Sequence, residues 1–210
     1  EFYRSCDYIG CISKLTYDIV RQCQDQYKTK QFVNYVPHGV DVDVLKPMPE
    51  SEIVEFRKGL TKAWEEINFI VLWNNRNIRR KIPTDIMDGF AKFNKRHPDS
   101  CLIMHTKQLN FMEGTDLPKV KTDLYPDAKI AFSTQAYDWP AMRILYNSAD
   151  VTINVANAEG FGLSSLESMA CGTPVINAMT GGLQDQMFLD DDILKPCGIP
   201  VYPSCVSIIG

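Results

Sequence analysis

The sequence has no apolar run near the roughly 20 residues that a membrane-spanning helix needs, so nothing in it indicates a membrane span. It also has no internal repeat and no low-complexity tract, which excludes the repeat and fibrous classes. Lys and Arg total 22 against 26 Asp and Glu, giving a formal net charge of −4. Non-specific nucleic-acid binding needs concentrated positive charge. We therefore expect no nucleic acid among the partners.

Cysteine-pair motifs are missing as well. The chain has seven cysteines, an odd number, and none forms a Cys-x-x-Cys pair: Cys6, Cys11, Cys23, Cys101, Cys171, Cys197 and Cys205. Several lie inside apolar runs, a usage typical of reduced, buried thiols in a cytoplasmic protein. A zinc site formed by the first three and His38 is conceivable, but their spacing matches no common zinc finger.

The chain is long enough to fold around a real core. Its 210 residues are 45% hydrophobic, which suits one or two ordinary domains. It opens at Glu1 without a methionine and stops at Gly210 directly after a strand-like run. We therefore expect a fragment of a longer protein.

Short apolar runs alternate with segments of helical period along the whole chain. Strands are expected at residues 8–13, 32–36, 68–73, 101–106, 129–134, 151–155 and 174–178. Helices are expected at residues 15–23, 51–60, 83–97 and 139–149, with a proline-rich linker over 40–50. Strands alternating with helices predict a parallel sheet covered on both faces, which is a doubly wound α/β fold. Ligands of such sheets bind beyond the carboxyl ends of the strands.

One strand end carries glycines and a carboxylate, in NAEGFGLSSLESMACGTPV (residues 157–175). Gly160 and Gly162 allow the backbone to approach a ligand closely, and Glu159 stands beside them. A helix is expected to begin near Leu163, and the free N–H groups at a helix start favour phosphate. The loop is therefore a candidate binding site.

A second carboxylate, Glu167, lies on the helix that follows. Leu163, Leu166 and Ala170 mark the expected apolar face, and Glu167 falls on that face too. A bare carboxylate there is costly unless hydrogen-bond donors meet it. Two interpretations remain open: a capping box with Ser164 as the N-cap, or a carboxylate that accepts from ligand hydroxyls such as a ribose diol. Spacing alone favours the capping box.

Positive charge gathers after the strand at 68–73, just before a helix expected to open at Pro83: Arg76, Arg79, Arg80 and Lys81. Cations near a helix N-terminus oppose its macrodipole, and a bound anion would remove that conflict. A solvated basic turn is the alternative. The two strand-end loops together fit a nucleotide diphosphate that carries a hydroxyl-rich group.

These residues resemble a known family. EGFGLSSLESMACGTPV (159–175) resembles the Glu-x7-Glu signature of the retaining GT-B glycosyltransferases, the group that contains sucrose synthase-like, glycogen synthase-like and mannosyltransferase enzymes. VPHGVDVDVLKP (36–47) is similar to the interdomain stretch of that family. LYNSADV (145–151) resembles the junction before the signature, and TGGLQD (180–185) resembles the glycine-rich loop after it.

The resemblance implies a role for each candidate residue. Glu159 would contact hydroxyls of the donor sugar, and Glu167 would hold the ribose of the nucleotide. Arg76 and Lys81 would act in catalysis by binding the diphosphate and offsetting the charge of the leaving group, so that neither metal nor cofactor is required. Main-chain N–H groups would meet the sugar and phosphate from Gly160, Phe161, Gly162 and Leu163.

Further donor contacts implied by the family are less specific. They are Thr134 and Gln135 near the base, and Thr180 and Gly181 in the glycine-rich loop. The sequence departs from the family pattern at two positions. His38 replaces the usual Asn, and Ile82 stands where a glycine usually follows the lysine.

The family consists of two facing Rossmann-like domains. Residues 1–40 would be the end of the acceptor-side domain with the hinge, and residues 41–210 the nucleotide-sugar donor-binding domain, truncated at its carboxyl end. The resemblance implies a retaining hexosyltransferase that acts on a nucleotide-diphosphate sugar and an acceptor such as a glycan, lipid or protein. The fragment alone would be inactive or weakly active, and any peripheral membrane association would come from the missing domain.

Three alternatives remain at this stage. A nucleotide-sugar 2-epimerase shares the two-domain architecture. A non-catalytic nucleotide-sugar-binding module would bind donor and never transfer it. A phage-type enzyme that glucosylates DNA is disfavoured by the acidic net charge.

Overall fold

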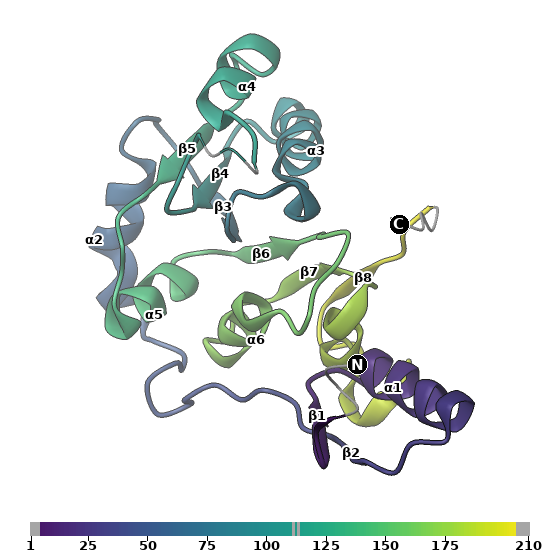
Figure 1. Ribbon diagram of the computed structural model, residues 1–210. Helices are drawn as coiled ribbons and strands as arrows, with labels where there is room; N and C mark the ends of the chain where they lie inside the picture. The colour runs from purple at the N-terminus through teal and green to yellow at the C-terminus, as the bar shows by residue number, and fades with distance from the viewer. Residues whose placement is uncertain (1–4, 111, 113, 205–210) are drawn as a thin grey trace.

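The computed structural model describes residues 5–110, 112 and 114–204. Its centre is a parallel sheet in the order β5-β4-β3-β6-β7-β8 (Figure 1). The strands are β3 (Phe69–Asn74), β4 (Ser100–His105), β5 (Ile130–Ser133), β6 (Val151–Asn154), β7 (Val175–Ala178) and β8 (Ile199–Val201). This architecture confirms the predicted Rossmann-like, doubly wound α/β fold.

Helices connect these strands and cover both faces of the sheet. They are α2 (Glu50–Thr61), α3 (Pro83–Arg96), α4 (Leu117–Leu124), α5 (Trp139–Asn147) and α6 (Leu163–Ala170). Short 3-10 helices also occur between these strands: η2 (Arg79–Lys81), η3 (Gly181–Gln186) and η4 (Leu189–Asp191). Every helix and strand expected from the sequence is present. In contrast, α4, β8 and the 3-10 helices were not predicted from the sequence.

Successive side chains of β3 point to the two opposite faces of the sheet. Val71 and Trp73 pack in a cluster with residues of α3 and α4. Ile70 and Leu72 pack in a second cluster with residues of α2, α5 and the end of α6. Because successive strand side chains point to opposite faces, one buried strand supplies both cores.

The first residues form a separate small unit. β1 (Tyr8–Cys11) pairs in parallel with β2 (Phe32–Tyr35), and α1 (Lys14–Tyr27) connects them. This unit lies beside the late part of the chain (Figure 1), where the Lys14 N–H donates to Asp185 of η3 at 2.8 Å. The start of α1 therefore contacts the segment that follows β7.

A linker without helix or strand leads from β2 to α2 (Figure 1). The Met48 N–H donates to Asn147 Oδ1 at 2.8 Å, and Arg143 Nε donates to the Lys46 carbonyl at 3.0 Å. Leu45 is 1% exposed. The linker is thus held against the carboxyl-terminal half of α5.

The prediction of buried cysteines is only partly right. Buried thiols are Cys11, Cys101 and Cys171, and Cys6 is half-buried. Cys23 and Cys197 are exposed, so the prediction was wrong for these two. Cys23 lies on α1, a helix in which only Gln24 is buried, so most of the surface of this helix is in solvent. Cys205 lies outside the described residues.

Candidate functional site

The strand order places two loops at the point where the sheet reverses direction. From β3 the chain moves outward to β4 and β5, then returns to the other side of β3 as β6. The loops after β3 and β6 therefore leave neighbouring carboxyl ends in opposite directions, which is where parallel α/β sheets bind ligands. They are joined directly, because the Asn157 N–H donates to the Arg80 carbonyl at 2.8 Å and Arg80 Nη1 donates to the Ala158 carbonyl at 2.7 Å.

Lys81 and Glu159 meet between these loops. The Lys81 ammonium forms an ion pair with the Glu159 carboxylate, and their side chains are 7% and 11% exposed. Arg80 Nη1 lies 3.7 Å from the same carboxylate. Burial, with a smaller effect from Arg80, lowers the pKa of Lys81 to about 8, while the Glu159 charge acts in the opposite direction. The structure therefore brings together two residues that the sequence analysis assigned to one site.

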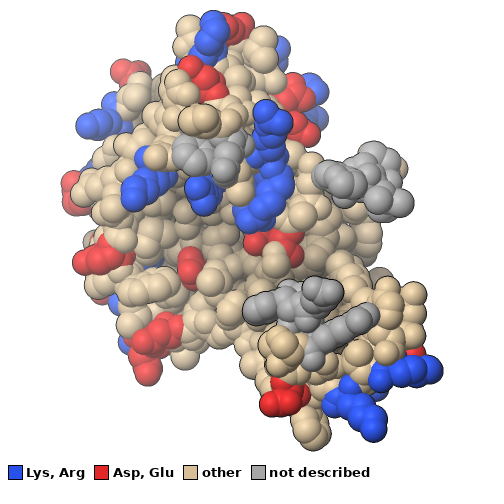
Figure 2. Space-filling view, in the orientation of Figure 1, with Lys and Arg blue, Asp and Glu red and all other residues tan. Residues whose placement is uncertain are grey.

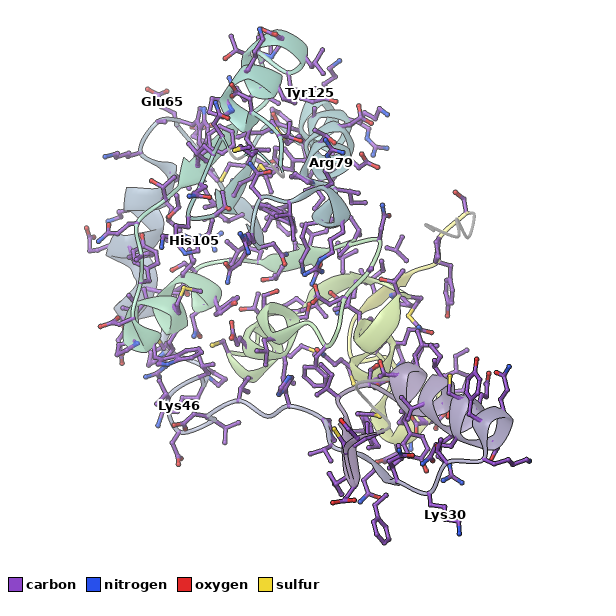
Figure 3. All side chains as sticks on the ribbon, viewed as in Figure 1. Lys30, Lys46, Glu65, Arg79, His105 and Tyr125 are labelled. Carbon is purple, nitrogen blue, oxygen red and sulfur yellow. The ribbon has the colours of Figure 1, made fainter. Side chains whose placement is uncertain are left out.

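The surface carries the same pattern of charge. Figure 2 shows Lys and Arg side chains gathered over the start of α3, with acidic side chains directly below them toward the loop after β6. Figure 3 labels Arg79 beside that helix start. A cavity of about 450 Å³ opens here, lined by Arg80, Glu159, Gly160 and Gly181 together with the start of α1.

Close backbone packing fixes the position of Glu159. The Gly182 N–H donates to the Glu159 carbonyl at 2.9 Å. Gly181 has φ +50°, and a methyl group on it would clash with that same carbonyl oxygen. Gly162 has φ +95° directly before α6. Glycine is needed at both positions because other residues rarely adopt this conformation.

Ile82 is the departure from the family pattern with a visible structural consequence. It follows Lys81 and has φ 39° and ψ 52°, in the left-handed region. This conformation is a genuine outlier for a β-branched residue. A glycine would adopt it without strain, so the structure gives a physical reason for the residue that the family usually has there.

Glu167 is held by a partner that the sequence analysis missed. Tyr146 Oη donates to Glu167 Oε2 at 2.5 Å and accepts from Asn74 Nδ2 at 2.6 Å. Tyr146 is 0% exposed and Glu167 is 8% exposed. Burial raises the pKa of Glu167, and the hydrogen bond from Tyr146 acts in the opposite direction. Asn74 is the last residue of β3, so Glu167 is linked to the end of this strand through Tyr146. Glu159 is linked to the loop after the same strand through Lys81.

The capping-box interpretation of Glu167 was wrong. The N-cap of α6 is Gly162, no side chain caps the helix, and Ser164 lies within it. The expected apolar face was also wrong, because Leu163 is 42% exposed whereas Ser165 and Ser168 are fully buried. The buried serines form hydrogen bonds to polar side chains of β6 and β7. Small hydroxyl residues let α6 lie close to the sheet.

The remaining predicted residues lie in loops that follow the carboxyl ends of the strands. Arg76 is exposed and lines a cavity of about 530 Å³ between the loops after β3 and β4. This cavity is separate from the one lined by Arg80 and Glu159. Thr134 and Gln135 are exposed after β5. Thr180 Oγ1 donates to the Ala156 carbonyl at 2.7 Å, so this hydroxyl holds the loop after β6.

The cavity beside Arg76 has polar walls with unused hydrogen-bonding capacity. Asn75 Nδ2 and Thr106 Oγ1 are buried, and neither atom has a hydrogen-bond partner among the described residues. His105 also lines it (Figure 3), with Nδ1 2.9 Å from Ser133 Oγ and its ring stacked on Tyr137 at 5.0 Å. Burial lowers the pKa of His105. Buried polar atoms without partners need an explanation, and a bound ligand would supply one.

The side chain of Phe161 has a packing role. Its side chain is 6% exposed, and its ring meets the His38 ring edge-on at 5.3 Å. His38, which replaces the usual Asn, therefore contacts the signature loop from the linker. Only the main chain of Phe161 remains available for the role that the family resemblance implies.

In the described part of the chain, no three His, Cys, Asp or Glu side chains come close enough together to hold a metal ion. Among the same residues, no helix combines the length and the hydropathy needed to span a membrane.

Comparison with known proteins shows which family this chain is similar to. The model of glycosyl transferases group 1 matches residues 120–191. A D-inositol 3-phosphate glycosyltransferase of Acidothermus cellulolyticus is 31% identical over 177 residues, which are 80% of this chain and 38% of that protein. A mannosylfructose-phosphate synthase of Agrobacterium fabrum is 25% identical over 186 residues, which are 86% of this chain and 39% of that protein.

Solved structures share the fold. The Anabaena protein HepE in complex with UDP-glucose matches with a TM-score of 0.74 and 20% identity, over 96% of this chain and 51% of that chain. The chain belongs to the glycosyl transferases group 1 family and shares the fold of GT-B structures. Sucrose-phosphate synthase from Thermosynechococcus elongatus matches with a TM-score of 0.68 and 20% identity, over 97% of this chain and 47% of that chain. The chain thus spans about half of these GT-B structures and 38% and 39% of the two curated relatives.

Proposed function

We propose that this chain is the donor-binding part of a retaining GT-B hexosyltransferase that uses a nucleotide-diphosphate sugar. The observation that carries the proposal is the meeting of Lys81 and Glu159 at the reversal point of the sheet. Glu167 is tied to the end of the same strand through Tyr146. A cation for a diphosphate and two acceptors for hydroxyls thus lie around the carboxyl end of β3.

In this proposal the roles follow from charge and position. Lys81 and Arg76 bind the diphosphate and offset the charge that develops on the leaving nucleotide, so that no metal is needed. The N–H groups at the start of α6 receive phosphate or sugar oxygens. Glu159 accepts from sugar hydroxyls, and it shares Lys81 with the arriving diphosphate.

Known relatives support this choice of donor. HepE was solved with UDP-glucose, and the Acidothermus relative is named as a glycosyltransferase. The acceptor, whether glycan, lipid or protein, belongs in this proposal to an acceptor-side domain of which residues 1–40 are the end. A cytoplasmic location and a peripheral membrane contact through that domain remain part of the proposal.

Titration calorimetry of the 210-residue chain with UDP-, GDP- and ADP-sugars tests donor binding. We expect saturable binding of at least one of them. Arg76→Ala and Lys81→Ala should each weaken it about 10-fold or more, because a charge-assisted hydrogen bond contributes about 1.5–3 kcal/mol. Lys92→Ala is the matched control, since Lys92 lies on α3 and pairs only with Asp88 at 2.6 Å among the described residues.

Failure of all three nucleotide-sugars to bind would refute the proposed donor role. Unchanged affinity in both the Arg76 and the Lys81 variant would remove the diphosphate assignment. Because Lys81 is buried, each variant is first checked for a cooperative unfolding transition.

A further inference from the structure

We propose that Tyr146 is a positioning residue that orients the Glu167 carboxylate for the ribose hydroxyls of the donor. The inference rests on the proposed function and extends it to Asn74 and Tyr146, two residues to which the family resemblance assigned no role. It starts from three side chains on three different elements: Asn74 at the end of β3, Tyr146 on α5 and Glu167 on α6.

The direction of the hydrogen bonds is fixed by chemistry. A side-chain amide Nδ2 can only donate, so the Tyr146 oxygen accepts from Asn74 at 2.6 Å. The single hydroxyl proton is then free to point to Glu167 Oε2, which lies 2.5 Å away. Burial and the Glu167 charge raise the pKa of Tyr146 well above its usual range, so the hydroxyl keeps its proton.

Tyr146 is held too firmly to turn away. It is fully buried on α5, and its main-chain carbonyl accepts from Thr173 Oγ1 at 2.7 Å. Its ring packs in the cluster that includes Leu72 of β3 and Cys171. Such a donor fixes the rotamer of the carboxylate that it meets.

Only one oxygen of Glu167 is used in this way. Oε2 receives the Tyr146 proton, and Oε1 has no hydrogen bond to any residue that the structure describes. An ionised carboxylate accepts up to about four hydrogen bonds. The arrangement leaves Oε1 as an acceptor, and a vicinal diol is the ligand group whose two donors suit it.

The hydrogen bonds between Asn74, Tyr146 and Glu167 also link the basic loop to the glycine loop. Asn74 directly precedes the basic loop that carries Lys81, whereas Glu167 follows the glycine loop that carries Glu159. The hydrogen bonds through Tyr146 therefore set the separation between the ribose acceptor and the start of the diphosphate loop.

The test compares ribose with deoxyribose. Affinities of wild type and Tyr146→Phe are measured by calorimetry for UDP, GDP and ADP and for their 2′-deoxy and 3′-deoxy forms. Wild type should prefer at least one ribonucleotide over its deoxy forms by about 10- to 100-fold, the effect of a hydrogen bond to a charged acceptor. In Tyr146→Phe this preference should fall below about 3-fold, while the deoxy forms bind as before.

Three further variants keep the test interpretable. Asn74→Ala should reduce the ribose preference in part, because it removes only the bond to the hydroxyl oxygen. Glu167→Gln should lower it as Tyr146→Phe does, and the double variant should lower it no further. Tyr125→Phe is the control, because Tyr125 Oη contacts Asp88 at 3.4 Å on the other face of the sheet and should leave the preference unchanged.

A signature of the hydroxyl itself gives an independent readout. The Tyr146 Oη proton should appear in NMR spectra as a slowly exchanging resonance that is lost in Tyr146→Phe and shifted in Glu167→Gln. A wild type that binds no nucleoside diphosphate overturns both proposals. Binding with an undiminished ribose preference in a folded Tyr146→Phe, or without any preference in wild type, overturns the positioning role and leaves the proposed function standing.

Discussion

Removing the Lys81 ammonium should destabilise the fold as well as weaken ligand binding. In Lys81→Met the Glu159 carboxylate stays in place with a side chain only 11% exposed. Breaking a buried ion pair on one side costs about 3–5 kcal/mol because the remaining charge is uncompensated. Arg80 Nη1, 3.7 Å away on a side chain that is 46% exposed, provides partial compensation. We therefore expect a loss near the lower limit, about 3 kcal/mol.

Replacing both partners should restore much of that loss. An apolar pair of similar volume is often neutral relative to a buried ion pair, so Lys81→Met/Glu159→Leu should recover at least half of the destabilisation. Urea unfolding followed by circular dichroism measures both variants. With a slope of about 2 kcal/mol per molar urea, the single variant should move the midpoint down by about 1.5 M.

The control breaks an ion pair that lies in solvent. Lys92→Met removes the partner of Asp88, where the two side chains are 72% and 44% exposed, and should not shift the midpoint measurably. The reasoning fails if Lys81→Met unfolds at the wild-type midpoint. The reasoning also fails if the double variant is destabilised by the full sum of the losses caused by Lys81→Met and by Glu159→Leu alone.

Three further predictions concern the same loops. Nucleotide binding should weaken as pH rises through about 8, because Lys81, with its pKa lowered to about 8, then loses the charge that attracts phosphate, and Lys81→Arg should remove this dependence. Gly181→Ala should lower the free energy of unfolding by more than about 2 kcal/mol, because a methyl group would clash with the Glu159 backbone. Gly59→Ala, in a helix with open space around it, should be neutral or stabilising by up to about 1 kcal/mol. At position 82, glycine should be more stable than alanine by about 1 kcal/mol, because the φ of 39° favours it.

The contradicting results are equally specific. An affinity that stays flat between pH 7 and 9 would show that Lys81 does not carry the phosphate interaction. Equal stability of Gly181→Ala and Gly59→Ala in urea would contradict the close contact with Glu159. An Ile82→Ala variant more stable than Ile82→Gly would show that the backbone there is not left-handed in solution.

Much of the fold could be predicted because its strands are short, apolar and separated by helical periods. NFIVLW gave β3 to within one residue, and Pro83 marked the start of α3. By contrast, α4 has eight residues, of which only Leu117 is buried. A helix that presents one buried residue has little apolar periodicity, so its sequence reads as a loop.

Both loops of the site could be predicted from the sequence, but the contacts between their residues could not. The signature loop and the basic loop were both recognised, yet Lys81 and Glu159 are 78 residues apart, and nothing local shows that they touch. The capping box that spacing favoured for Glu167 was wrong. Its donor, Tyr146, could not be found from local sequence because it lies 21 residues earlier on another helix. Tyr146 lies in the LYNSADV stretch, but nothing in that stretch indicates that its side chain contacts Glu167. Only the strand order, which places β6 beside β3, brings these side chains together.

A crystal structure of the chain with the nucleotide-sugar that binds best in calorimetry tests the central claim most directly. The account predicts the diphosphate between the loops after β3 and β6, in contact with Lys81, and a ribose hydroxyl within hydrogen-bonding distance of Glu167. A ligand seated elsewhere, such as in the cavity of about 740 Å³ between the linker and α6, with the Lys81–Glu159 loops empty, would contradict it.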